Sequence, residues 1–171
     1  MSVNVQGVCS SDLQFTNVVA RWKGSTHDSR IWRNSSLYSR FLRNDFEGYL
    51  LGDNGYACSC HVLTPILHPV SDSERRYNRS HIRTRNTIER AFGVWKSRFQ
   101  CLQNTLRFTP KRCCDIIIAT AILHNFAIQR NAPPVASSEF LNDENDEPTE
   151  YPQSNPRGDS SRRRVIESYF S

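Results

Sequence analysis

Residues Arg75–Leu102 can form one long helix, because the stretch has no proline and its single glycine, Gly93, comes late. Apolar residues recur in it at spacings of three and four, which places them on one helical face: Ile88, Phe92, Trp95, Phe99 and Leu102. From Arg75 to Arg98 there are eight Lys or Arg residues. The only acid among them is Glu89. The chain is therefore organised around a basic, amphipathic helix with one carboxylate.

Glu89 has two interpretations. It can form an ordinary surface ion pair with Arg85 or Arg90, which contributes little to stability. Alternatively, it is a metal-binding carboxylate on a helix whose positive charge also holds a polyanion. The helix alone does not decide between them.

Charge is divided unevenly along the 171 residues. Residues 1–135 hold 18 Lys and Arg against 9 Asp and Glu, and residues 136–171 hold 4 against 8. We therefore predict a basic domain over residues 1–132 and a disordered acidic tail over residues 133–171, which ends in a basic cluster and an apolar tip. A basic domain favours a nucleic-acid partner, although many domains are basic for no specific reason.

No apolar run reaches membrane length, and no signal peptide is recognisable, so we expect no membrane partner. We interpret the six cysteines as reduced thiols of an intracellular protein. Cys58, Cys60 and His61 could suggest zinc, but one residue between the two cysteines is too few for the usual spacing and no second pair is present.

The predicted order of elements is hairpin, helix, strand, helix, helix. We expect strands at about 3–9, 15–22 and 49–53, a helix at about 28–43, and long helices at about 75–102 and 110–130. Residues 63–67 (LTPIL) are a candidate edge strand, because Pro65 cannot donate a backbone hydrogen bond. This pattern predicts an α/β fold.

Two aspartates stand at element ends. Asp53 follows the apolar run Tyr49–Leu51, and the C-terminal ends of strands are where open α/β sheets bind ligands. The sequence Asp53-Asn54-Gly55 is also ordinary turn chemistry. Asp28 stands in the first turn of the predicted helix at 28–43, where an acid favours the helix dipole whatever else it does.

Several motifs together carry a family resemblance. They are VNVQGVC, VVARWKGSTHDSRIW, LLGDNGY, LTPIL, RYNRSHIRTRNTIERAFGVWKSRFQCL, ILHNF and a closing VIESYF. In this order they closely resemble the DDE endonuclease domain of Harbinger-type (PIF/Harbinger) transposases and of nucleases derived from them. The resemblance covers roughly residues 3–130 and the extreme C-terminus, and it implies an RNase H-like fold, a mixed sheet flanked by helices.

The resemblance also implies a chemistry. Three carboxylates hold divalent metal, Mg²⁺ or Mn²⁺, which cleaves phosphodiester bonds or transfers strands. Asp53 matches the second acidic position and Glu89 the third, with 35 residues between them. Asp28, His81 and Arg85 are candidates to support these ligands. Asn78, His81, Arg85 and Glu89 share one helical face, which we interpret as carrying the metal ligand and contacts to phosphate. Candidate DNA-backbone contacts are Arg79, Arg83, Arg90, Lys96 and Arg98.

The family's first acid lies on a strand before VNVQGVC, and this sequence starts at Met1 without it. We therefore expect the chain as given to be inactive. An alternative is a catalytically dead, domesticated DNA- or protein-binding module, and another is an ordinary α/β interaction protein. By resemblance, we expect DNA and a separate Myb-like DNA-binding protein as partners, and a location in the nucleus and cytoplasm.

Overall fold

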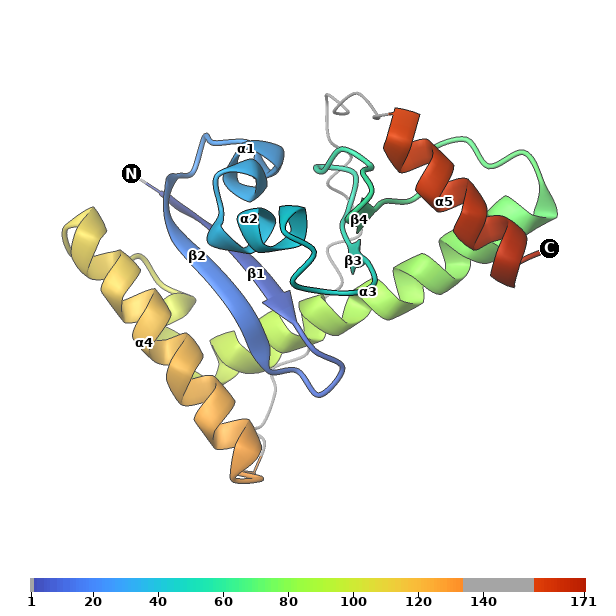
Figure 1. Ribbon diagram of the computed structural model, residues 1–171. Helices are drawn as coiled ribbons and strands as arrows, with labels where there is room; N and C mark the ends of the chain where they lie inside the picture. The colour runs from blue at the N-terminus through green and yellow to red at the C-terminus, as the bar shows by residue number, and fades with distance from the viewer. Residues whose placement is uncertain (1, 134–155) are drawn as a thin grey trace. The chain divides into compact units, whose positions relative to one another are not determined.

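The computed structural model describes residues 2–133 and 156–171 (Figure 1). It is a mixed α/β structure of small sheets and helices. The chain divides into two compact units. The hairpin unit comprises Met1–Thr26 and Thr87–Asn145, and the strand-pair unit comprises His27–Asn86 and Asp146–Ser171.

The hairpin unit is built on strands β1 (Val3–Cys9) and β2 (Phe15–Lys23), which pair antiparallel as predicted. Helix α4 (Pro110–Gln129) lies along β2 (Figure 1), and its bounds confirm the helix predicted at 110–130. Asn125 fixes it there, because its side chain accepts from the Phe15 amide at 2.8 Å and donates to the Phe15 carbonyl at 2.7 Å. The buried core of this unit consists of Phe15, Ala20, Ala91, Trp95, Ile117 and Ala121.

Helix α3 (Asp72–Arg98) is the long basic helix. It begins three residues earlier than predicted, because Ser71 and Glu74 form a capping box: the Glu74 amide donates to Ser71 Oγ at 3.2 Å, and the Ser71 amide to Glu74 Oε2 at 3.0 Å. It ends at Arg98, and a 3₁₀ turn, η1 (Gln100–Leu102), follows. Residues up to Asn86 belong to the strand-pair unit and those from Thr87 to the hairpin unit.

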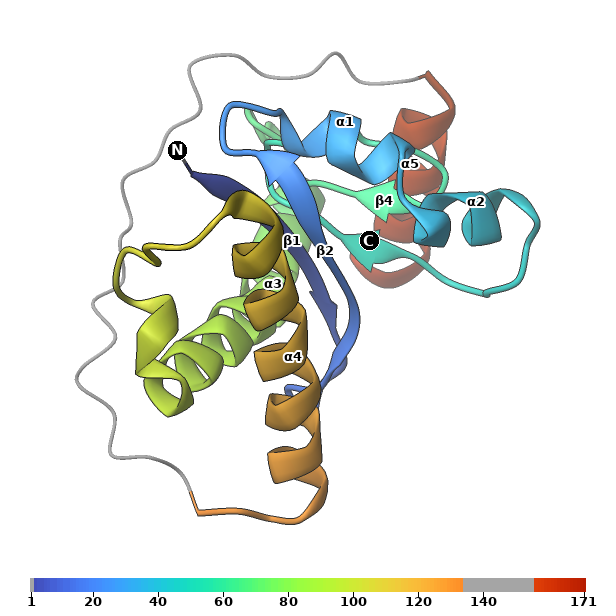
Figure 2. The same ribbon diagram turned by 90° about the vertical axis from the view of Figure 1, so that its left-hand side faces the viewer.

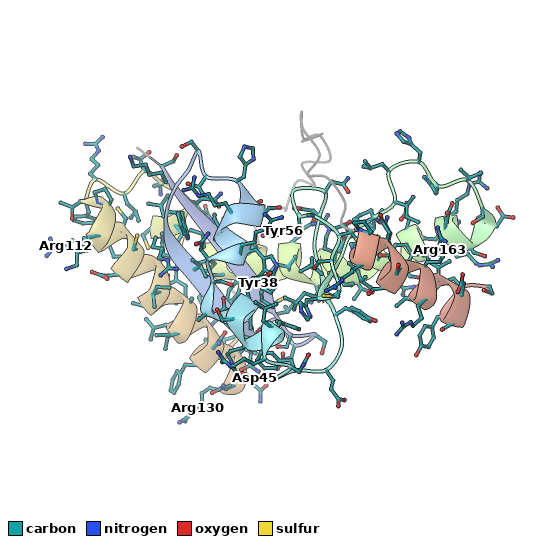
Figure 3. All side chains as sticks on the ribbon, turned by 45° about the horizontal axis from the view of Figure 1, so that its top comes forward. Tyr38, Asp45, Tyr56, Arg112, Arg130 and Arg163 are labelled. Atoms are coloured by element: carbon teal, nitrogen blue, oxygen red, sulfur yellow. The ribbon has the colours of Figure 1, made fainter. Side chains whose placement is uncertain are left out.

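The helix predicted at 28–43 is wrong as one element. The structure has α1 (Asp28–Arg33) and α2 (Ser36–Leu42) instead. Ser35 separates them, because its buried hydroxyl accepts from the Tyr38 amide at 3.0 Å and so caps a new helix. Both helices contribute to the core of Trp32, Phe41 and Val62. Tyr38 and Tyr56, which Figure 3 labels, are partly buried against it.

The second sheet is a parallel pair, β3 (Leu50–Leu51) and β4 (Val62–Leu63), shorter than the predicted strands at 49–53 and 63–67. Beyond β4, side chains of α3 form the hydrogen bonds to the backbone that a further strand would otherwise form. His81 Nε2 lies 3.0 Å from the Leu63 carbonyl, and Tyr77 Oη donates to the Thr64 carbonyl at 3.0 Å. Asn78 bonds both the amide and the carbonyl of Ile66, at 2.8 and 2.7 Å.

The predicted disorder of the tail is wrong for its last part, because Pro156–Tyr169 form helix α5. This helix packs against β4 (Figure 2). The acidic run at 139–150 lies outside the described residues. None of the helices in residues 2–133 and 156–171 is long and apolar enough to cross a membrane. The six cysteines are free thiols.

Candidate functional site

Asp53 stands two residues after the end of β3, as predicted, and this strand is half-buried. The Gly55 amide donates to its Oδ1 at 2.9 Å, and the Tyr56 amide donates to its backbone carbonyl at 3.2 Å. The side chain is exposed. The turn thus holds one carboxylate oxygen in place and keeps the group accessible.

Asp28 faces the same turn from the first residue of α1. A methyl group placed on Gly55 would lie 3.0 Å from Asp53 Oδ1 and 3.3 Å from Asp28 Oδ2. Ser29 fastens the helix to the turn, since its hydroxyl donates to the Gly55 carbonyl at 3.0 Å and accepts from the Ala57 amide at 3.3 Å. The structure therefore brings Asp28 and Asp53 together across a glycine. Sequence reasoning missed Ser29 and Gly55, although both stand in the quoted motifs.

His81, on α3, is close enough to this turn for the charge of Asp53 to affect its pKa. Burial lowers the pKa of its imidazole, Arg85 and Arg162 lower it further, and the Leu63 carbonyl and Asp53 oppose the shift. A neutral ring donates its Nε2 proton to the Leu63 carbonyl, which leaves Nδ1 buried without a partner in the described residues. His81 thus supports β4 and lies within electrostatic reach of Asp53.

The helical face of Asn78, His81, Arg85 and Glu89 is only partly available to phosphate, contrary to the sequence interpretation. Asn78 and His81 use their side chains on the backbone of residues 63–66. The periodicity of a helix shows which residues share a face, but it does not show whether a loop of the same chain covers that face.

The two buried histidines predict instability in acid. Burial is the main cause that lowers the pKa of both His81 and His124 below the ordinary 6.5. An unfolded chain takes up both protons near its ordinary pKa, whereas the folded chain keeps the rings neutral. Stability is therefore fully present above about pH 6.5 and falls as the pH drops below it. Urea unfolding at pH values from about 7 to about 5 measures this loss.

The control is the double variant His81→Gln/His124→Gln, whose amides can still donate to the carbonyls of Leu63 and Leu13. It should be less stable at neutral pH, with a flatter pH dependence in this range. A wild-type slope in the double variant would contradict the prediction.

Glu89 and the remaining cationic candidates lie on α3. Glu89 is exposed and belongs to the hairpin unit, whereas Asp28 and Asp53 belong to the strand-pair unit. Arg79, Arg83, Arg90 and Lys96 are exposed, as a phosphate-binding role requires. Arg98 differs, because its Nε is buried without a partner in the described residues and its charge lowers the pKa of His124.

Carboxylate oxygens are the ligands that Mg²⁺ and Mn²⁺ prefer, so the pair Asp28 and Asp53 fits such an ion in donor type. Within residues 2–133 and 156–171, no group of three or more His, Cys, Asp or Glu side chains could hold a metal. Two carboxylates fall short of such a group, so metal binding at this turn stays a prediction.

The sequence model described as DDE superfamily endonuclease matches residues 1–125. This chain belongs to that family.

Three relatives illustrate the similarity. The chain is 34% identical over 131 residues to "Putative nuclease HARBI1" of Mus musculus and 33% identical over 132 residues to that of Homo sapiens. These alignments cover 74% and 75% of this chain and 38% of each relative. "Protein ALP1-like" of Arabidopsis thaliana is 25% identical over 143 residues, which are 74% of this chain and 35% of that protein. The chain thus spans less than half the length of these relatives. No solved structure matches it.

Proposed function

We propose that this chain is part of a metal-dependent DNA endonuclease with an RNase H-like fold, in which Asp53 and Glu89 are the metal-binding carboxylates. Membership of the DDE endonuclease family supports the reaction class. The observation that carries the proposal is the position of Asp53, which is exposed at the end of β3 and paired with Asp28 across Gly55. Glu89 is assigned by the family resemblance alone. Two carboxylates that lie close together repel each other, and a bound cation would offset this repulsion.

A bound Mg²⁺ or Mn²⁺ would activate the attacking water or hydroxyl and stabilise the leaving oxygen. Asp53 would hold it through the oxygen that Gly55 leaves unbonded. Asp28, held by Ser29 on the same turn, adds negative charge that favours a cation there. His81 acts on this arrangement indirectly, by fixing β4 beside the strand that carries Asp53.

DNA is the substrate we propose, because the exposed Arg79, Arg83, Arg90 and Lys96 on α3 suit phosphate contacts. We also propose a nuclear location and a Myb-like DNA-binding partner protein on the basis of the family alone.

The test is nicking of supercoiled plasmid by the complete protein that carries this chain. Cleavage should require Mg²⁺ or Mn²⁺ and stop when EDTA removes the metal. Glu89→Gln should lose most of it, because the amide keeps the size of the side chain but not its charge. Glu47→Gln, another exposed glutamate, is the matched control and should cleave as the wild type does.

Cleavage that persists in EDTA, or in Glu89→Gln at the rate of the control, would overturn the proposal. DNA binding without any metal-dependent cleavage would instead support the alternative of a binding module that has lost its chemistry.

A further inference from the structure

The three consecutive arginines of α5 have different environments. Arg162 points inward: its Nη1 donates to the carbonyls of Thr64 and Pro65 at 3.3 and 3.2 Å, and its Nη2 pairs with Asp159 at 2.7 Å. Its side chain is only 17% exposed. Arg163, which Figure 3 labels, and Arg164 are both exposed, and neither makes an ion pair within the described part of the chain.

Helix α5 is fixed at both ends, so it presents these two side chains in one orientation. Near its start, Gly158 packs directly on the backbone of Cys58 and Ser59. Just after its end, the Phe170 carbonyl accepts from Arg76 Nε at 3.1 Å, and the Phe170 ring meets Tyr77 edge-on at 5.8 Å. These contacts connect α5 to residues 58 and 59, which follow the Asp53 turn, and to the first turns of α3.

We infer that α5, which belongs to the strand-pair unit, is a nucleic-acid-binding element. Its Arg163 and Arg164 bind DNA phosphates. The inference rests on the proposed function and adds a second helix to it, because the arginines named above are all on α3. Guanidinium groups bind phosphate oxygens through paired hydrogen bonds, and exposed arginines that pair with no acid in residues 2–133 and 156–171 are available to do so.

The outer side of α5 favours a polyanion over a lipid surface. Its apolar residues Val165 and Ile166 are half-buried, whereas Arg163, Arg164 and Ser160 are exposed. A helix that binds a membrane presents its apolar side chains outward. Along the middle of α5, Arg163 and Arg164 are outward and Val165 and Ile166 are half-buried, and the exposed Tyr169 lies at the end of the helix. Phosphates along a DNA backbone are therefore the ligand that fits.

The experiment measures binding of a short fluorescent DNA duplex over a range of salt concentrations. Arg163→Gln/Arg164→Gln should weaken binding by about tenfold or more and reduce the slope of log affinity against log salt by about 1.8, or about 0.9 for each phosphate contact. Arg163→Lys/Arg164→Lys keeps both charges and should restore most of the slope.

The matched control is Arg40→Gln/Arg43→Gln, which removes the same charge from the same unit. Both of these arginines are exposed and pair with Asp45, which Figure 3 labels, so we expect little change in affinity or slope. Equal losses in the two glutamine pairs would show a net-charge effect and overturn the inference. So would preferential binding of polyglutamate over DNA.

Two results separate this inference from the proposed function. If Glu89→Gln abolishes cleavage while Arg163→Gln/Arg164→Gln binds DNA as the wild type does, the function stands and the role of α5 falls. If the wild type binds no DNA at low salt, both fall. Circular dichroism and melting temperature should be unchanged in the glutamine pair, because both side chains are exposed.

Discussion

Asp53→Asn is expected to reduce metal-dependent DNA cleavage by about two to four orders of magnitude, because losing a metal ligand removes several kcal/mol of transition-state stabilisation. Asparagine has the shape of aspartate, and its oxygen can still accept from the Gly55 amide, so the turn should persist. Only the charge is lost. Plasmid nicking with Mn²⁺ measures the loss of cleavage, and calorimetric titration of Mn²⁺ measures the loss of metal binding.

The control is Asp45→Asn, an exposed aspartate of the same unit whose partners are Arg40 and Arg43. It should cleave DNA and bind Mn²⁺ as the wild type does. If Asp53→Asn cleaves within twofold of that control, Asp53 is not a metal ligand and its conformation is ordinary turn chemistry.

Gly55→Ala examines the same turn without removing a charge. Its added methyl group would lie 3.0 Å from Asp53 Oδ1 and 3.3 Å from Asp28 Oδ2, so the two carboxylates would have to shift. The backbone of Gly55 does not have a positive φ, which means that alanine introduces no strain of its own. We therefore expect this variant to bind Mn²⁺ more weakly, because the added methyl group takes up the space between the two carboxylates.

The sequence predicted the elements whose signals are local. The hairpin, α4 and the position of Asp53 after a short strand were all predicted from residues that are close together in the sequence. The polar face of α3 was predicted less well. Asn78 and His81 have the same spacing as Arg85 and Glu89, and only the tertiary structure shows that their partners are the carbonyls and amide of residues 63–66.

Helix α5 is a second case that local sequence signals did not predict. Its composition, rich in Arg and Ser, has too few apolar residues to predict a packed helix. Packing comes instead from contacts that are far apart in sequence: Arg162 with the carbonyls after β4, and Phe170 with Tyr77. The pairing of Asp28 with Asp53 could likewise not be predicted from the sequence, because it depends on Ser29 holding α1 against a turn 26 residues away.

Gly158→Ala is expected to destabilise the strand-pair unit, although alanine normally favours a helix. Replacing an interior helical glycine gains up to about 1 kcal/mol. Here the new Cβ would overlap the carbonyl group of Cys58 and the amide nitrogen of Ser59. These are backbone atoms that cannot rotate away, and such overpacking costs about 1–3 kcal/mol. The unfavourable effect should therefore prevail, and the melting temperature should fall.

Ser160→Ala is the control, because Ser160 is exposed on the same helix and alanine there adds helix propensity without a clash. It should leave the melting temperature unchanged or slightly raised. Hydrogen exchange should locate the effect of Gly158→Ala in residues 58–64, where α5 covers the chain. If both variants raise the melting temperature alike, Gly158 does not lie against the backbone of Cys58, and α5 cannot hold Arg163 and Arg164 in a fixed orientation.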